Sequence, residues 1–131
     1  MRILHAALPE DWSAAHDSGS YDVSTRGVSL AEADFVHAST AAQLPGVLDR
    51  YYADVAEVDL LVIDLDRLDH EGATVRWEPV DGADDGPYPH VYGLIPTVAV
   101  VEVVRVSHDP GAGWTLPDLT SCDLASGPVT P

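Results

Sequence analysis

The sequence predicts a single α+β domain, and three observations support this fold class. Short apolar or alternating segments, which are typical of strands, outnumber the helical ones, and the two kinds do not alternate as they do in a doubly wound parallel sheet. The chain has 131 residues, enough for one domain with a buried core. It carries no glycine-rich phosphate loop of the Rossmann or P-loop kind, which would accompany a nucleotide-binding parallel sheet.

The strongest strand signal is the run 60–65, which is apolar at almost every position. A strand with two apolar faces lies in the middle of a sheet, so we expect this segment to be central. Shorter apolar or alternating runs predict further strands at 2–7, 21–24, 75–80 and 97–106. The polar stretch 66–73 and the Gly-, Asp- and Pro-rich stretch 81–89 are expected to be connections.

Three segments predict helical structure. Pro9, followed by acidic residues, opens a helical turn, and 29–34 has the length of one further turn. The longest helix is expected over 39–52, with apolar residues at helical spacing on its buried face. Thr40 can cap this helix, because Gln43 follows three residues later as in a capping box.

The charge balance excludes some classes of partner. The formal net charge is −16, and all six basic residues are Arg. Nucleic acids and anionic membrane surfaces both require clustered basic side chains, so neither is an expected partner. A small molecule or a protein acceptor is expected instead, and the sequence leaves the oligomeric state open.

Composition also predicts the compartment and the domain boundary. Cys122 is the only cysteine, which rules out an intramolecular disulfide. We find neither a signal-peptide pattern nor an apolar run of membrane length, and we expect a cytoplasmic protein. Pro, Gly, Ser and Asp dominate from residue 108 onward, which predicts a folded domain over 1–107 and a poorly ordered tail over 108–131.

The stretch 35–44 contains the main candidate site. Its first half favours a strand and its second half favours the start of a helix, so His37 is expected where one passes into the other. Backbone N–H groups and the positive end of a helix dipole suit such a position to an anionic or ribose-bearing ligand. The alternative is a turn histidine that is bonded to the helix cap.

His5 and His90 are also expected at strand ends, whereas the other three histidines lie in polar or Gly/Pro-rich surroundings typical of a surface. A cluster of His5, His37 and His90 in one cleft could form a metal site, an acid–base pair or a set of hydrogen-bond donors to a ribose. The HxH and HExxH spacings of zinc sites are absent, and we expect no metal.

Two further segments could add side chains to this cleft. Glu78, between Trp77 and Pro79 at a strand end, can be partly desolvated, which raises a carboxyl pKa and suits acid–base chemistry. The alternative is a carboxylate at the rim of an edge strand. His90 and Tyr92 alternate along a strand and therefore share a face, which predicts a binding edge.

Together these motifs resemble the DUF952 family, small bacterial proteins without a settled function. The resemblance spans residues 2–106 and depends mainly on Ile3-Leu4-His5, Phe35-Val36-His37-Ala38-Ser39-Thr40 with Gln43-Leu44, Arg76-Trp77-Glu78 and Pro89-His90-Val91-Tyr92-Gly93. Asp34 departs from the family pattern, which usually has Gly before the Phe-Val-His segment.

The DUF952 fold is similar to that of the ADP-ribosyltransferases, a split and strongly bent β-structure with NAD in its cleft. The resemblance therefore implies an enzyme that cleaves the nicotinamide–ribose bond of NAD or a related nucleotide. A non-catalytic small-molecule or nucleotide-binding protein is the alternative. The resemblance also implies that His5 holds a ribose and that His37 is catalytic, with Glu78 or His90 steadying the ribosyl cation. The other implied cofactor-binding residues are Ser39, Thr40, Gln43, Trp77 and Tyr92.

Overall fold

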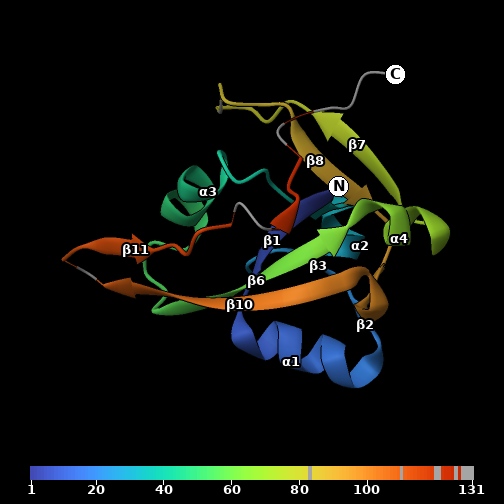
Figure 1. Cartoon of the computed structure of the whole chain (residues 1–131), viewed down its shortest axis with the longest axis horizontal. Coiled ribbons are helices and arrows are strands. Elements are labelled where there is room, and N and C mark those ends of the chain that lie inside the picture. The colour runs from blue at the N-terminus through green and yellow to red at the C-terminus, as the bar shows by residue number, and fades with distance from the viewer. Residues whose placement is uncertain (83, 110, 120–121, 126, 128–131) are drawn as a thin grey trace.

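Two antiparallel sheets form the frame of the protein (Figure 1). The computed structural model describes residues 1–82, 84–109, 111–119, 122–125 and 127. Their helices are α1 (Pro9–Ser18), α2 (Leu30–Ala33), α3 (Leu44–Tyr51), α4 (Leu65–His70) and the 3-10 turn η1 (Thr97–Ala99). Their strands are β1 (Arg2–Ala7), β2 (Ser20–Tyr21), β3 (Val23–Thr25), β4 (Val28–Ser29), β5 (Val36–His37), β6 (Glu57–Asp64), β7 (Thr74–Glu78), β8 (Tyr88–Tyr92), β9 (Ile95–Pro96), β10 (Val100–Asp109) and β11 (Gly113–Thr115). The predicted α+β class is confirmed.

The larger sheet has the strand order β1-β6-β10-β11, and each neighbouring pair is antiparallel. The run predicted to be central is confirmed as β6, between β1 and β10. Leu61 and Ile63 pack in one apolar cluster, whereas Val58, Leu60 and Val62 pack in another, and all five side chains are fully buried. Because both faces of β6 are covered, the strand is apolar at consecutive positions.

Different helices cover the two faces of this sheet. Ala15 of α1 belongs to the cluster that contains Leu61, whereas Leu44 and Leu48 of α3 belong to the cluster that contains Leu60. Accordingly, α1 and α3 lie on opposite sides of β6 and β10 (Figure 1). None of the helices in the described ranges has the length and apolar composition needed to cross a membrane.

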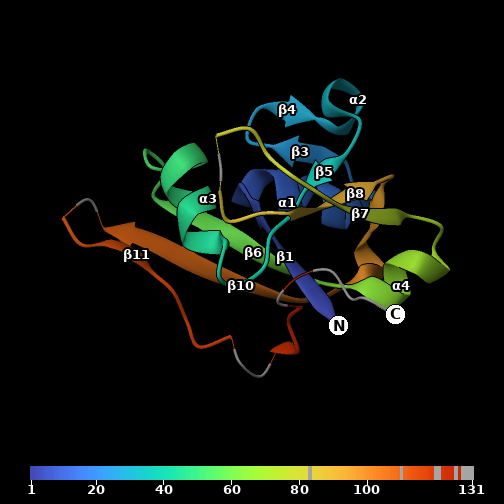
Figure 2. The same cartoon turned by 90° about the horizontal axis from the view of Figure 1, so that it is seen from above.

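The smaller sheet, with the order β5-β8-β7, contains most of the candidate site residues. Its antiparallel register places His37 opposite His90, and His90 opposite Arg76. Two backbone hydrogen bonds connect it to β1, from Ser39 N to Leu4 O (2.8 Å) and from Leu4 N to Ser39 O (2.9 Å). The short ribbons β2–β9 and β3–β4 complete a split, curled half-barrel. In Figure 2 the β3–β4 ribbon lies beside β5.

The longest helix starts later than the sequence predicts, at Leu44 instead of residue 39. The predicted capping box does form, because Gln43 N donates to Thr40 Oγ1 (3.3 Å) and Thr40 N donates to Gln43 Oε1 (3.0 Å). These bonds close a separate turn, and the regular helix follows it with Pro45 in its first turn.

Two other boundaries also differ from the prediction. The expected connection 66–73 begins with α4, because the Asp64 side chain caps this helix by accepting a hydrogen bond from Arg67 N (3.0 Å). The strand expected over 97–106 begins after η1 and continues to Asp109, so that β10 crosses the predicted domain boundary at residue 107.

The described part of the 108–131 segment is folded onto the domain, contrary to the expectation of a poorly ordered tail. β11 pairs with the end of β10, and the Trp114 ring stacks on His108 with centroids 4.7 Å apart. Farther along, Ala125 N donates to Arg2 O (2.9 Å), and Ala125 is buried. The rest of that expectation falls on residues 110, 120–121, 126 and 128–131, which lie outside the described residues.

Replacing Leu61 by Ala should destabilise the protein by about 2–5 kcal/mol, because the substitution leaves a cavity beside a strand that is buried on both faces. Urea denaturation of the wild type and the variant measures this loss. Val103→Ala is the matched control, since Val103 is 39 % exposed on β10, and it should change stability by less than about 1 kcal/mol. Equal losses in both variants would contradict the central role of β6.

Candidate functional site

A small cavity lies beside the histidines of the smaller sheet. Its volume is about 250 Å³, and His37 of β5 and His90 of β8 both line it. The remaining lining residues are Ser24, Thr25, Val28, Ala33, Phe35, Tyr51, Pro79 and Val80. They come from β3, β4, α2, α3 and the segments before β5 and after β7, so parts of the chain that are distant in sequence meet here. We call this cavity the His37 pocket.

Three side chains form a hydrogen-bonded series that ends at the wall of this pocket. Glu78 Oε1 lies 2.9 Å from His90 Nδ1, and His90 Nε2 lies 3.2 Å from His37 Nδ1. Tyr92 donates its hydroxyl hydrogen to the same Glu78 oxygen at 2.5 Å. The Glu78 side chain is 34 % exposed and that of His90 only 4 %, so the series runs from a partly exposed carboxylate into the buried wall.

The chemistry of the groups determines the direction of these hydrogen bonds. A carboxylate can only accept, so His90 carries its hydrogen on Nδ1 and donates it to Glu78. In a neutral His90 the other nitrogen, Nε2, is then an acceptor, and His37 must donate to it from Nδ1. A neutral His37 with its hydrogen on Nδ1 has an unprotonated Nε2. The series therefore leaves one bare lone pair on His37.

His37 and Glu78, at the two ends of the series, both have shifted pKa values. Burial, followed by the proximity of His90, lowers the pKa of His37 to about 3, so its imidazole is neutral at pH 7. Hydrogen bonds from Tyr92 and His90 lower the pKa of the Glu78 carboxyl group. Desolvation alone would raise this pKa, but the two hydrogen bonds outweigh it, so the carboxylate form is favoured.

His37 Nε2 is buried and has no hydrogen-bond partner among the residues that the structure describes. Buried polar atoms are almost always paired in proteins, so an exception calls for an explanation. Flat rings surround it: His37 stacks on Tyr88 with centroids 5.1 Å apart and meets the Tyr51 ring edge-on at 6.1 Å. Phe35 stacks on His90 at 4.0 Å. The pocket wall therefore combines aromatic surface with one unused acceptor.

His5 does not join this series as a ligand-binding group. It donates from Nδ1 to the backbone oxygen of His37 (2.6 Å), and its Nε2 accepts from the Tyr21 hydroxyl (2.8 Å). Burial lowers the pKa of His5 to about 4, in keeping with a neutral ring. Because both ring nitrogens are used within the protein, the expected ribose contact of His5 is corrected to a structural role that ties β1 to β5 and β2.

The residues after His37 also have structural partners. The backbone of Ser39 pairs with Leu4, and the Thr40 and Gln43 amides are used in their reciprocal turn. The Gln43 side chain donates to the backbone oxygens of Asp85 and Pro87, at 2.8 Å each. Ser39 and Thr40 therefore lack the free N–H groups expected for a phosphate. In the structure Gln43 supports the neighbouring loop, and the cofactor contacts expected of Ser39, Thr40 and Gln43 stay predictions.

Trp77 and Tyr92 likewise lie outside the pocket lining. Trp77 lines a different surface depression, together with Leu65 and Thr74. Tyr92 acts on the site through Glu78, and its ring lies under the Arg76 guanidinium, 4.8 Å from Cζ to the centroid. The sequence thus predicted the members of the hydrogen-bonded series, but not which neighbouring residues line the pocket.

Sequence reasoning did not assign Phe35 and Tyr51 to the site. Phe35 precedes His37 by two residues, and this spacing along an extended segment indicates a shared face. That alternation is the signal that could have identified it. Tyr51 is the last residue of α3, and it lines the pocket from there.

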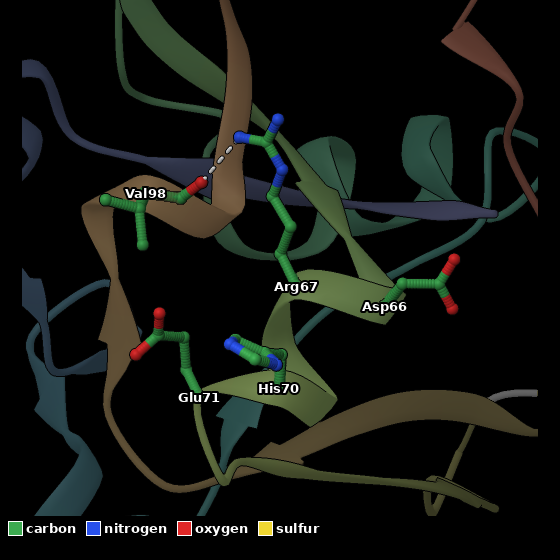
Figure 3. Close-up of a pocket in the computed structure, with 5 residues that line it drawn as sticks. All are labelled: Asp66, Arg67, His70, Glu71 and Val98. Carbon is green, nitrogen blue, oxygen red and sulfur yellow. Dashed lines mark hydrogen bonds between the residues drawn. The ribbon is translucent and has the colours of Figure 1, made fainter.

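A larger depression, of about 340 Å³, lies between α4 and η1 (Figure 3). Its labelled side chains do not converge, because Asp66 points away from His70 and Glu71. Arg67 donates a hydrogen bond to the backbone oxygen of Val98 (2.9 Å). No unpaired buried polar atom marks this depression among the described residues. The His37 pocket is therefore the better candidate for chemistry.

Metal binding finds no support in the side-chain arrangement. Over the described residues, no group of three or more His, Cys, Asp or Glu side chains is placed to hold a metal ion. His5 uses both ring nitrogens and His90 is bonded at both of its own, so the three strand-end histidines do not present free nitrogens around one point.

Comparison with known proteins agrees with this architecture. The sequence profile of DUF952, described as a protein of unknown function, matches residues 6–103. The chain belongs to the DUF952 family. No curated protein matches the chain.

Its fold is similar to that of protein CC0527 from Caulobacter crescentus. The crystal structure of CC0527 superposes with a TM-score of 0.72 at 22% identity, covering 88% of this chain and 94% of that one. A double mutant of the same protein gives a TM-score of 0.72 at 19% identity, with the same coverage. The solution NMR structure gives 0.66 at 22%, covering 92% and 94%. These likenesses establish the fold.

The buried neutral histidines predict a loss of stability in mild acid. Both His5 and His37 have folded-state pKa values below the ordinary 6.5, so neither is protonated above that pH in the folded or the unfolded chain. As pH falls from 6.5 toward 4, the unfolded chain takes up protons that the folded chain cannot, and stability decreases. For His5 alone, the loss between about pH 7.5 and about pH 5 should be on the order of 2 kcal/mol.

Urea denaturation at the two pH values measures this dependence. His5→Gln should show a shallower loss than the wild type, because the titrating ring is gone. His16→Gln is the control, since His16 is exposed on α1 and should keep the wild-type dependence. An unchanged pH dependence in His5→Gln would contradict the assignment of His5 as a buried neutral group.

Proposed function

We propose that the chain is an ADP-ribosyltransferase-like enzyme that acts on NAD or a related nucleotide, with the nicotinamide end of the ligand in the His37 pocket. The observation that carries this proposal is the buried, unpartnered Nε2 of His37 at the end of the Glu78–His90–His37 series. Perturbed, connected titratable groups beside a cavity are typical of functional sites. The family resemblance supplies the reaction class.

The size of the pocket limits which part of a nucleotide it can take. At about 250 Å³ it is smaller than the roughly 300–1,000 Å³ usual for whole-ligand sites. It therefore suits one ring and its immediate substituents, while the rest of a dinucleotide would lie across the neighbouring surface. In this placement His5 and Ser39 are not ligand contacts, because both ring nitrogens of His5 and the backbone N–H and C=O of Ser39 are engaged within the protein.

The electrostatics of the pocket favour a cationic or neutral ring. Its lining contains no Arg, the chain contains no Lys, and the formal net charge is −16. The nicotinamide ring of NAD is positively charged, and aromatic faces such as those of Phe35 and Tyr51 attract a cationic ring. A negatively charged protein field adds to this attraction.

In this proposal NAD supplies its ADP-ribosyl group to an acceptor. The bond from ribose C1′ to the nicotinamide nitrogen breaks, nicotinamide leaves with the bonding electrons, and an oxygen or nitrogen of the acceptor bonds to C1′ and gives up its proton to solvent. The His37 ring and the surrounding aromatic side chains position the nicotinamide end. Glu78 acts through His90, because its carboxylate holds the His90 ring in one tautomer and supplies negative charge along the series. Tyr92 is a positioning residue that orients Glu78.

Calorimetric titration with NAD tests this function. The wild type should bind NAD, and His37→Ala should bind it at least tenfold more weakly, since the variant loses both the acceptor and part of the ring wall. Thermal melting should show both proteins folded, because the backbone oxygen of His37 that holds His5 remains in the variant. His70→Ala, on the exposed face of α4, is the matched control and should bind as the wild type does.

ADP-ribose, which lacks nicotinamide, should bind more weakly than NAD to the wild type. Release of nicotinamide, followed by chromatography, separates an enzyme from a non-catalytic binding protein, which remains the second candidate because the same cavity serves both. Absence of heat with NAD at millimolar concentration would refute the proposal.

A further inference from the structure

We infer that the His37 pocket distinguishes a carboxamide from a carboxylate on the ring it binds, because the pocket offers this substituent a hydrogen-bond acceptor and no cation. The inference rests on the proposed function for the identity of the ring. It adds a specificity: the pocket should take the amide form of the pyridine nucleotide and reject the corresponding acid. His37 is the residue that makes the distinction.

The hydrogen bonds between Glu78, His90 and His37 determine which nitrogen of His37 is an acceptor. Glu78 Oε1 accepts hydrogen bonds from both Tyr92 and His90. His90 therefore carries a hydrogen on Nδ1. With His90 neutral, the hydrogen bond between His90 Nε2 and His37 Nδ1, at 3.2 Å, takes its hydrogen from His37 Nδ1. The free Nε2 of His37 can accept an N–H or O–H hydrogen, and it has none to give.

The acceptor, His37 Nε2, is buried. His37 is 9 % exposed, and its Nε2 has neither a protein partner nor measurable contact with solvent. A ligand group that donates a hydrogen bond there would satisfy an atom that is otherwise left unpaired. A group that brings only lone pairs would face the lone pair of Nε2 and leave both unsatisfied. A primary amide has two N–H donors, whereas a carboxylate has none.

The lining of the pocket offers a bound carboxylate no positive charge. No Arg lines the pocket. Arg50 lies over the Tyr51 ring, with 5.8 Å from Cζ to the centroid, and its positive charge contributes to the lowered pKa of His37, but it does not line the pocket. Arg76 lies over the ring of Tyr92. A carboxylate entering the pocket would therefore lose its hydration with no arginine in the lining to pair with it.

Binding also requires access to the covered atom. Tyr51 is partly buried at the end of α3, and its ring meets His37 edge-on. In this inference the Tyr51 ring, which also lines the pocket, moves to admit the ligand to Nε2. Rotation of one partly exposed side chain is a common adjustment on ligand binding.

The test compares NAD with nicotinic acid adenine dinucleotide, which differs only in having a carboxylate in place of the carboxamide. Calorimetry should give at least tenfold tighter binding of NAD to the wild type. In His37→Phe, which keeps a ring and removes both nitrogens, the ratio of the two affinities should fall to near one. His70→Phe, on exposed α4, is the control and should keep the wild-type ratio.

Equal affinities in the wild type would overturn this inference and leave NAD binding, and thus the proposed function, intact. Failure of both ligands to bind would overturn both. A second measurement needs no ligand and no variant: long-range ¹H–¹⁵N NMR correlations should show the His37 hydrogen on Nδ1. A hydrogen on Nε2 at neutral pH would refute the inference even if His37→Phe does not fold.

Discussion

The structure depends on one buried imidazole, His5, which joins three separate segments. Its two ring nitrogens bond to the backbone oxygen of His37 and to the hydroxyl of Tyr21, so β1, β5 and β2 are held at fixed positions. The adjacent backbone pairing of Leu4 with Ser39 continues the same seam between the two sheets. The position of His37, and with it the pocket wall, therefore follows from a contact made by its backbone. Its side chain is left available for another task.

Much of the fold could be predicted from the sequence, because strands and helices that are buried carry apolar residues at regular spacing. The apolar run that became β6 is the clearest case, since both of its faces lie in the core. The errors arose where this pattern is weak or ambiguous. α4 is a short helix that depends on the cap from Asp64, and its polar composition resembles that of a loop. The segment around Trp114 contains few apolar residues, and what orders it is contact with β10, a long-range interaction.

The candidate site was predictable in its members and not in its connections. His37, Glu78 and His90 stand out in the sequence as polar residues at strand ends, and the structure brings them together. The same reasoning gave His5 and Ser39 ligand contacts, although both are engaged within the protein. Residue type and spacing indicate which groups can form hydrogen bonds. The choice between a ligand and a protein partner depends on register and burial, which only the folded chain supplies.

The position of β1 has a consequence for how the chain is made. The first strand pairs over its whole length with β6, and its Arg2 is flanked by residues from the far end of the chain. During synthesis β1 leaves the ribosome before β6 and β10. It has no sheet partner until β6 has been made, and the larger sheet is completed only after β10 follows. Non-local pairing of this kind slows folding, because the chain loses conformational entropy on closing the loop before the stabilising contacts have formed. The apolar strand β1 therefore depends on the later strands, or on a cellular chaperone, for protection from water until β6 and β10 have been synthesised.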